Sequence, residues 1–321
     1  MIKKILILFL ASLTLCLCSC GENAAYATDG ISIVTTVFPQ YDFARKITEG
    51  SDVSLRMLLP PGSEAHSYDP TPLDMISAAE CDLFIWVGGE SEAWAEKIIE
   101  SSGLERNRVL ALMDTVPLLE NADGHGDEND AEHAHEHSEE EAHDHEHDEH
   151  VWTSPKNAIT IVGAITERLC SIDPDNADIY LENSEEYIAE LTTLDADFET
   201  LAEKNCNKNL IFGDRFPFLY LAHSYGFEYA SPFRGCSSHT EASMAEITEV
   251  IEKAKGLGTK TVFSVDFSNE KLANTIASEI GAKVLRLYSC HTASKEDLEK
   301  GIGYLELMRM NLESIKTALG E

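Results

Sequence analysis

The chain has 321 residues, of which 43% are hydrophobic, and it carries a formal net charge of -33 at pH 7. This length and apolar content suffice for two separate cores. The negative charge repels nucleic acid and anionic lipid headgroups, so we expect no nucleic-acid binding and a preference for cations and basic partners.

Residues 1–19 are typical of a lipoprotein signal peptide. Two lysines precede an apolar run from Ile5 to Leu17, which is too short to span a bilayer core of ~30 Å as a helix. Leu17-Cys18-Ser19-Cys20 then resembles a lipobox, and cleavage would leave Cys20 as a lipid-modified N-terminus followed by a tether over residues 20–30. Cleavage after Ala27 is the alternative, and it would give a soluble product.

Residues 31–172 are predicted to form a first α/β lobe, because short apolar runs alternate with helical patterns. Such alternation, with continuous apolar strands, predicts a parallel sheet covered on both faces. The expected strands are Ile31–Val37, Val53–Leu59, Leu83–Val87 and Val109–Leu112, and the expected helices are Asp42–Glu49, Leu73–Glu80 and Ala93–Ser101.

A histidine-rich insertion interrupts this lobe at residues 121–149. Its histidines alternate with acidic residues, and neutral imidazole is a good ligand for zinc, copper and nickel. Almost nothing there can be buried, so we expect a disordered loop that offers several weak auxiliary metal sites. The alternative is a plain acidic linker, which has no need of so many histidines. The histidines are His125, His133, His135, His137, His143, His145 and His147.

Two further histidines occupy positions where the neighbouring backbone can fix the orientation of a metal-ligating side chain. His150 is followed directly by Val151-Trp152 and by a helix that begins at Pro155. His66 lies in a turn-rich loop, Pro60 to Pro70, directly after a predicted strand. Ligands of open α/β sheets gather at the carboxyl ends of strands, so both are candidate ligands.

A long helix over residues 173–205 is predicted to join this lobe to a second one over residues 206–321. From Asp175 to Lys204 there is no Gly or Pro, and apolar residues recur at helical spacing over roughly 45 Å. A single rigid rod between lobes predicts modest domain closure, and an ordinary surface helix within one lobe is the alternative. In the second lobe the expected strands are Leu210–Gly213, Phe227–Ala230, Thr261–Val265 and Lys283–Leu287, and the expected helices are Ala242–Lys255 and Asn269–Ile280. The predicted fold class is therefore α/β, with two lobes of parallel sheets flanked by helices and joined by one long rigid linker helix.

Five cysteines follow Cys20. Disulfides are permitted in an exported protein, and an odd count leaves at least one thiol unpaired. We expect a Cys236–Cys290 bridge, because both residues follow predicted strands, and buried free thiols at Cys81, Cys170 and Cys206.

Several short motifs occur together in this chain. They are the lipobox, Thr36-Val37-Phe38-Pro39, His66-x-Tyr68-x-Pro70, Asp82-Leu83-Phe84 with Gly88, and His150-Val151-Trp152 before Pro155. In this combination the sequence resembles the zinc- and manganese-type solute-binding lipoproteins of ABC metal importers, the cluster with a rigid linker helix. The resemblance covers essentially the whole mature chain, and the histidine-rich insertion indicates the zinc branch.

The resemblance implies a metal site shared by the two lobes. It places two ligands on His66 and His150 and an acidic ligand on Asp266, whereas Gly213 stands where a further His or Glu is expected. Zinc takes about four ligands, and manganese, which accepts more oxygen, stays open. Candidate substitutes for the missing ligand are His239 and His291, with Asp214 and Glu241 as further oxygen donors; His223 is expected to be structural.

The expected function is extracytoplasmic capture of zinc by a lipid-anchored monomer, with delivery to an ABC permease. A metal buffer or adhesin, in which the histidine-rich loop is the whole function, is one alternative. A zinc-dependent hydrolase is another, but the chain contains no H-E-x-x-H and no serine nucleophile motif, so we expect no enzymatic activity.

Overall fold

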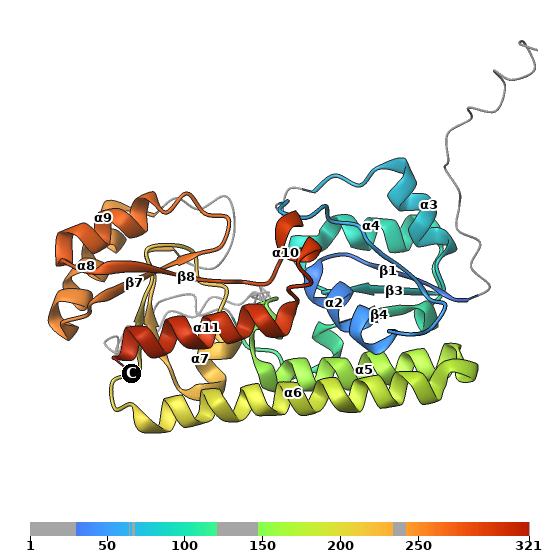
Figure 1. Ribbon diagram of the computed structural model, residues 1–321. Coiled ribbons are helices and arrows are strands. Elements are labelled where there is room, and N and C mark those ends of the chain that lie inside the picture. The colour runs from blue at the N-terminus through green and yellow to red at the C-terminus, as the bar shows by residue number, and fades with distance from the viewer. Residues whose placement is uncertain (1–29, 64, 66–67, 121–146, 234–241, 321) are drawn as a thin grey trace, which may run out of the picture.

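The computed structural model describes residues 30–63, 65, 68–120, 147–233 and 242–320. Two lobes lie side by side above a long helical layer (Figure 1). The expected signal peptide, Cys20 and residues 121–146 of the histidine-rich insertion lie outside the described residues. Within the described ranges, no helix has both the length and the apolar character needed to cross a membrane.

The first lobe is built on a four-stranded parallel sheet in the order β2-β1-β3-β4. All four predicted strands are confirmed, with slightly shorter bounds. Helix α2 begins four residues earlier than expected, because Pro39 is compatible with a first helical turn and the Gln40 side chain accepts a hydrogen bond from Val37 N (3.1 Å). The elements are β1 Ser32–Thr35, α2 Phe38–Ile47, β2 Ser54–Met57, α3 Pro72–Glu80, β3 Leu83–Trp86, α4 Ala93–Ser102, β4 Val109–Ala111 and α5 Pro155–Ile172.

The second lobe contains two parallel strand pairs, β5-β6 and β7-β8. A parallel bridge between Phe212 and Phe263 joins them, and the predicted strands and helices are confirmed. The elements are β5 Asn209–Ile211, α7 Leu219–Tyr225, β6 Glu228–Ala230, α8 Met244–Leu257, β7 Thr261–Val265, α9 Lys271–Ile280, β8 Lys283–Leu287, α10 Lys295–Glu299 and α11 Tyr304–Leu319.

The predicted linker is confirmed as α6, Ala177–Lys204, directly preceded by a 3-10 turn at Pro174–Asn176. Helix α6 runs beneath both lobes alongside α5 (Figure 1). Its apolar stripe, which includes Leu191 and Phe198, is buried in the main core. This burial, rather than helix propensity alone, holds a helix of 28 residues straight against the two lobes.

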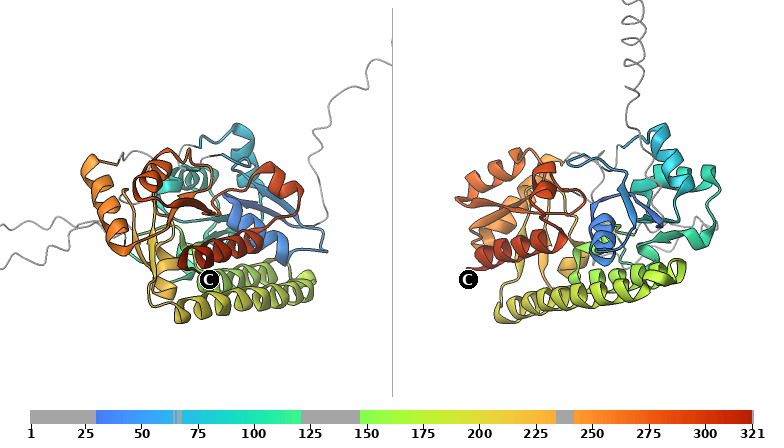
Figure 2. Two further views of the ribbon diagram at one scale, coloured as in Figure 1. Left: turned by 60° about the vertical axis from the view of Figure 1, so that its left-hand side comes forward. Right: turned by 45° about the vertical axis from the view of Figure 1, so that its right-hand side comes forward.

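Helix α11 is a second connection between the lobes, which the sequence did not reveal. It lies along α6 and crosses to the first lobe (Figure 2). Tyr304 N donates to Asp42 Oδ2 (2.8 Å), and the Tyr304 hydroxyl donates to Trp152 O (2.6 Å). A Cβ on Gly303 would lie 2.6 Å from the same Asp42 oxygen, so a larger residue would have to displace the Asp42 carboxylate. Helix α11 therefore adds a second contact between the lobes beside the linker helix α6.

Candidate metal centre

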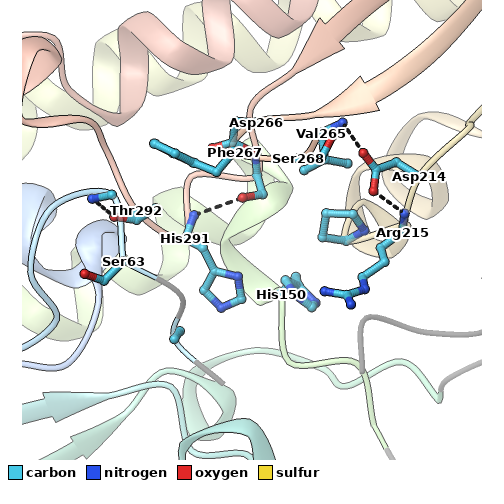
Figure 3. Close-up of a pocket in the computed structure, with 14 residues that line it drawn as sticks. Ser63, His150, Asp214, Arg215, Val265, Asp266, Phe267, Ser268, His291 and Thr292 are labelled. Carbon is cyan, nitrogen blue, oxygen red and sulfur yellow. Dashed lines mark hydrogen bonds between the residues drawn. The ribbon is translucent and has the colours of Figure 1, made fainter. Parts of the chain in front are cut away.

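A cavity of about 230 Å³ lies between the lobes. Its walls come from the loops that follow β2, β5, β7 and β8 and from the segment that precedes α5 (Figure 3). It therefore lies at the carboxyl ends of strands, where the sequence predicts a ligand site. Among the lining residues are Ala65, His150, Asp214, Arg215, Asp266, Ser289, His291 and Thr292.

His150 reaches this cavity from the start of the 3-10 turn Val151–Thr153. Its side chain is buried, and its Nδ1 lies 3.2 Å from Asp148 Oδ1, which also accepts from His150 N (2.9 Å). A carboxylate on one ring nitrogen fixes the orientation of an imidazole and increases its basicity toward a metal on the other nitrogen. Asp148 was not singled out from the sequence, although the Asp-x-His spacing before a helix is a usable signal.

His291 lies next to His150 in the cavity, on the loop that follows β8. The two ring centroids are 4.9 Å apart, and the Trp152 ring lies 4.9 Å from His291. The His291 amide donates to Ser289 Oγ (3.3 Å), and its carbonyl accepts from Phe38 N at the start of α2 (3.2 Å). The structure thus brings one substitute candidate, His291, together with one of the two principal histidines.

Asp266 follows β7 and lines the same cavity, but one of its carboxylate oxygens already accepts a hydrogen bond from the backbone. Its Oδ1 accepts from Ser289 N (2.7 Å), whereas Oδ2 is buried without a hydrogen-bond partner among the residues described. Burial raises the pKa of Asp266 from 3.8 to about 6. Within the described ranges, three or more His, Cys, Asp or Glu side chains are nowhere grouped closely enough to hold one ion, so Asp266 does not join the two imidazoles directly.

The opposite wall carries Asp214 and Arg215, which follow β5. Both Asp214 oxygens accept from backbone amides, Oδ1 from Arg215 N (2.9 Å) and Oδ2 from Val265 N (3.2 Å). The Arg215 side chain extends toward His150 (Figure 3). Arg215 was missed in the sequence, although a basic residue directly after a predicted strand could have drawn notice.

Gly213 shows why its position supplies no ligand. A Cβ added there would lie 2.3 Å from the Ala273 Cα in α9. A side chain at position 213 would therefore meet α9, so this position cannot carry a His or Glu without displacing the helix.

The remaining candidates have mixed outcomes. His66, His239, Cys236 and Glu241 lie outside the described residues, although Ala65, next to His66, lines the cavity. Cys290 is buried and is a free thiol among the described residues, while the expected bridge to Cys236 involves a residue outside them. The burial of that thiol raises its pKa well above the usual range.

The structure also shows how far the other thiols and His223 are exposed. Cys81 is buried as expected, but Cys170 is only half-buried and Cys206 is exposed, because they lie near or beyond the ends of α5 and α6. His223 is exposed on α7 and does not line the cavity.

Comparison with known proteins gives a consistent set of relatives. Residues 33–318 match the family model of the periplasmic zinc-uptake complex component A, ZnuA. The high-affinity zinc uptake system protein ZnuA of Bacillus subtilis is 34% identical over 97% of this chain and 96% of that protein. The crystal structure of the metal-dependent lipoprotein YcdH from Bacillus subtilis matches with a TM-score of 0.73 at 30% identity, over 90% of this chain and all of that one. The zinc-binding lipoprotein AdcA of Streptococcus pneumoniae is 29% identical over 98% of this chain, which spans 60% of AdcA.

Proposed function

Since this chain belongs to the family of periplasmic zinc-uptake components, we propose that it captures zinc between its lobes and delivers it to the permease of an ABC importer. The observation that carries the proposal is the pair of imidazoles, His150 and His291, whose ring centroids lie 4.9 Å apart in the cavity at the strand ends. The relatives are uptake and metal-binding proteins. The chain is therefore not an enzyme, and the hydrolase considered from the sequence is excluded.

The proposed ligands are His66, His150 and His291, with Asp266 as the oxygen donor. Nitrogen-rich sets with about four ligands suit zinc, whereas manganese favours more oxygen and is the weaker cargo. Because Asp148 engages His150 Nδ1, we assign Nε2 as the zinc-binding nitrogen. The Oδ2 atom of Asp266 has no hydrogen-bond partner among the described residues, so it would complete the set after a movement of its loop or through a bridging water. His239 is the alternative if that movement does not occur.

The location proposed for the protein follows from its N-terminus and its family. Lipid attachment at Cys20 would hold a monomer on the extracytoplasmic face of the membrane, next to the permease. A Cys20→Ala variant is then expected to move from the membrane fraction to the soluble fraction while its zinc affinity stays unchanged.

Zinc affinity measured by competition with a chromophoric chelator tests the site. His66→Ala and His150→Ala should each weaken tight binding by at least about 10-fold, because each removes a direct ligand. His223→Ala is the matched control, since His223 is exposed on α7. Wild-type affinity in both ligand variants would refute the assignment. Zinc uptake by cells whose only copy is His150→Ala then tests delivery, which should fail.

A shortened chain separates this proposal from the metal-buffer or adhesin alternative. Glu120 and His147 form an antiparallel bridge, so a two-residue Asn-Gly turn can replace residues 121–146 and keep that bridge. Native mass spectrometry should then show one tightly bound zinc in the shortened chain. A buffer would lose nearly all its zinc, because the remaining histidines would contribute nothing.

A further inference from the structure

Tyr220 is a second-lobe residue whose hydroxyl group reaches the segment that carries His150. It lies on α7 and is buried. Its hydroxyl oxygen accepts a hydrogen bond from Leu119 N (3.1 Å) and its proton is donated to Asp148 O (2.8 Å). One hydroxyl therefore uses both its donor and its acceptor capacity on two backbone groups that are far apart in sequence.

Those two backbone groups lie on opposite sides of the base of the histidine-rich insertion. Asp148 N donates to Leu119 O (2.9 Å), and the antiparallel bridge between Glu120 and His147 follows directly. We call residues 119–120 and 147–148 the stem. Tyr220 is thus the side chain through which the second lobe is hydrogen-bonded to both strands of the stem.

The stem leads directly to the proposed zinc ligand. Asp148, whose carbonyl accepts from Tyr220, holds His150 Nδ1 through its carboxylate. Beyond His150, the second lobe is also in contact, because Trp152 Nε1 donates to Ser289 O (2.9 Å). The ligand-bearing segment is therefore anchored to the second lobe on both sides of His150, and Tyr220 is the anchor on the stem side.

We propose that Tyr220 is a positioning residue for zinc binding, which closes the stem and thereby fixes Asp148 and the ring of His150 in the cavity. This inference rests on the proposed function, since it presumes that His150 binds zinc. The hydroxyl acts through Asp148 and touches no ligand itself. Phenylalanine would fill the same space but would leave the Leu119 N–H and the Asp148 carbonyl without their partner, so the stem could separate.

The first test compares two conservative variants of the same helix. Tyr220→Phe should weaken zinc affinity by about 10-fold, as loss of an outer-shell partner of a metal ligand typically does, with faster zinc release in stopped-flow chelation. Tyr225→Phe is the matched control, because its hydroxyl donates to Asp195 Oδ1 on α6 (2.7 Å), away from the stem. Equal zinc affinity in the two variants would overturn the inference. It would not affect the proposed function, which His150→Ala tests.

A second test asks whether the effect passes through the stem. In the chain with Asn-Gly in place of residues 121–146, a covalent turn keeps the two strands together, so Tyr220→Phe should weaken zinc affinity by no more than about 2-fold. An undiminished 10-fold loss in that shortened chain would overturn the stem mechanism.

Hydrogen exchange provides a readout that does not depend on zinc. The peptide that contains Leu119 should exchange faster in metal-free Tyr220→Phe than in Tyr225→Phe, because the amide has lost its acceptor. Unchanged protection of that peptide in Tyr220→Phe would contradict the inference even if the zinc affinity fell.

Discussion

The two walls of the cavity differ in what their polar atoms are already bound to. On the imidazole wall, His150 is oriented by Asp148 and faces His291. On the carboxylate wall, both oxygens of Asp214 and one oxygen of Asp266 accept hydrogen bonds from backbone amides. The imidazole wall thus includes one ring that a carboxylate holds in place, whereas the carboxylate wall uses most of its oxygen atoms to hold its own loops.

This difference supports the proposal that the cavity binds zinc in preference to a purely oxygen-seeking ion. Borderline-soft zinc binds imidazole well, while manganese and magnesium depend on several oxygen ligands. Arg215 also lines the cavity, and its side chain extends toward His150 (Figure 3). Because zinc favours imidazole nitrogen, a dication is expected to lie close to the imidazole wall in spite of this positive charge, and four measurements can break or sharpen that expectation.

The largest expected effect is that of pH. A free imidazole titrates near ~6.5 and cannot bind metal when protonated, so zinc affinity should fall by about 100-fold or more between pH 7 and pH 5. Burial raises the pKa of Asp266 to about 6, so that carboxyl also takes up a proton over this range. Chelator competition across the pH range measures how steeply the zinc affinity depends on pH. Asp266→Asn should reduce the number of protons that compete with zinc by about one, and the pH dependence that is due to the imidazoles should remain. A wild-type affinity that does not change with pH would contradict the imidazole wall.

The next largest effect on zinc affinity is expected from the removal of the His291 side chain. Loss of an outer-shell partner alone weakens metal binding by about 10–100-fold, so loss of a direct ligand in His291→Ala should reach the upper end of that range. Asp266→Asn should cost less, because Asp266 is not grouped with the imidazoles in the described structure. Isothermal titration with zinc compares the two. A larger loss in Asp266→Asn would show that the carboxylate wall, and not the imidazole wall, dominates binding.

A third measurement concerns the stability of the carboxylate wall. Gly213→Ala should lower the free energy of unfolding by roughly 1–3 kcal/mol, because the new methyl group collides with α9. Gly163→Ala is the control: Gly163 lies inside α5 with open space around it, so alanine should stabilise the helix by about 0.5–1 kcal/mol. Denaturant unfolding measures both. Wild-type stability together with tighter zinc binding in Gly213→His would contradict this account of the missing ligand.

The smallest effect is expected at Glu92, a carboxyl that interacts with Glu149, the residue before His150. This carboxyl is fully buried and accepts from Val87 N (2.8 Å), and burial raises its pKa from 4.5 to about 7. The folded protein therefore binds this proton more tightly than the unfolded chain does, so its contribution to stability declines as pH rises from about 4.5 to 7. Glu92→Gln should remove that decline and raise the free energy of unfolding at pH 8 by on the order of 1 kcal/mol.

Unfolding at pH 5 and pH 8 checks the Glu92 prediction, with Glu90→Gln as an exposed control. If Glu92→Gln and wild type showed the same change in stability between the two pH values, Glu92 would not carry the proton.

Much of the architecture was predictable, because it depends on local patterns. Continuous apolar runs between helical stretches predicted the parallel strands, as at Leu83–Trp86 and Thr261–Val265. The 30 residues without Gly or Pro from Asp175 to Lys204 predicted α6. Helix α11 escaped notice because its role depends on the approach of Gly303 to Asp42, two residues that are far apart in the chain.

By itself the sequence determined the α/β lobes, the linker helix and the acidic histidine-rich composition, and it supplied the short set of histidines that are proposed as zinc ligands. Only the tertiary structure decided that the ring of His291 lies beside that of His150, that Gly213 meets α9, that the thiol of Cys290 is free and that the Tyr220 hydroxyl is hydrogen-bonded to both strands of the stem. The reason is physical. Helical and strand periodicity records which face of one element is buried, whereas the meeting of two loops depends on how separate elements pack, and no local pattern contains that information.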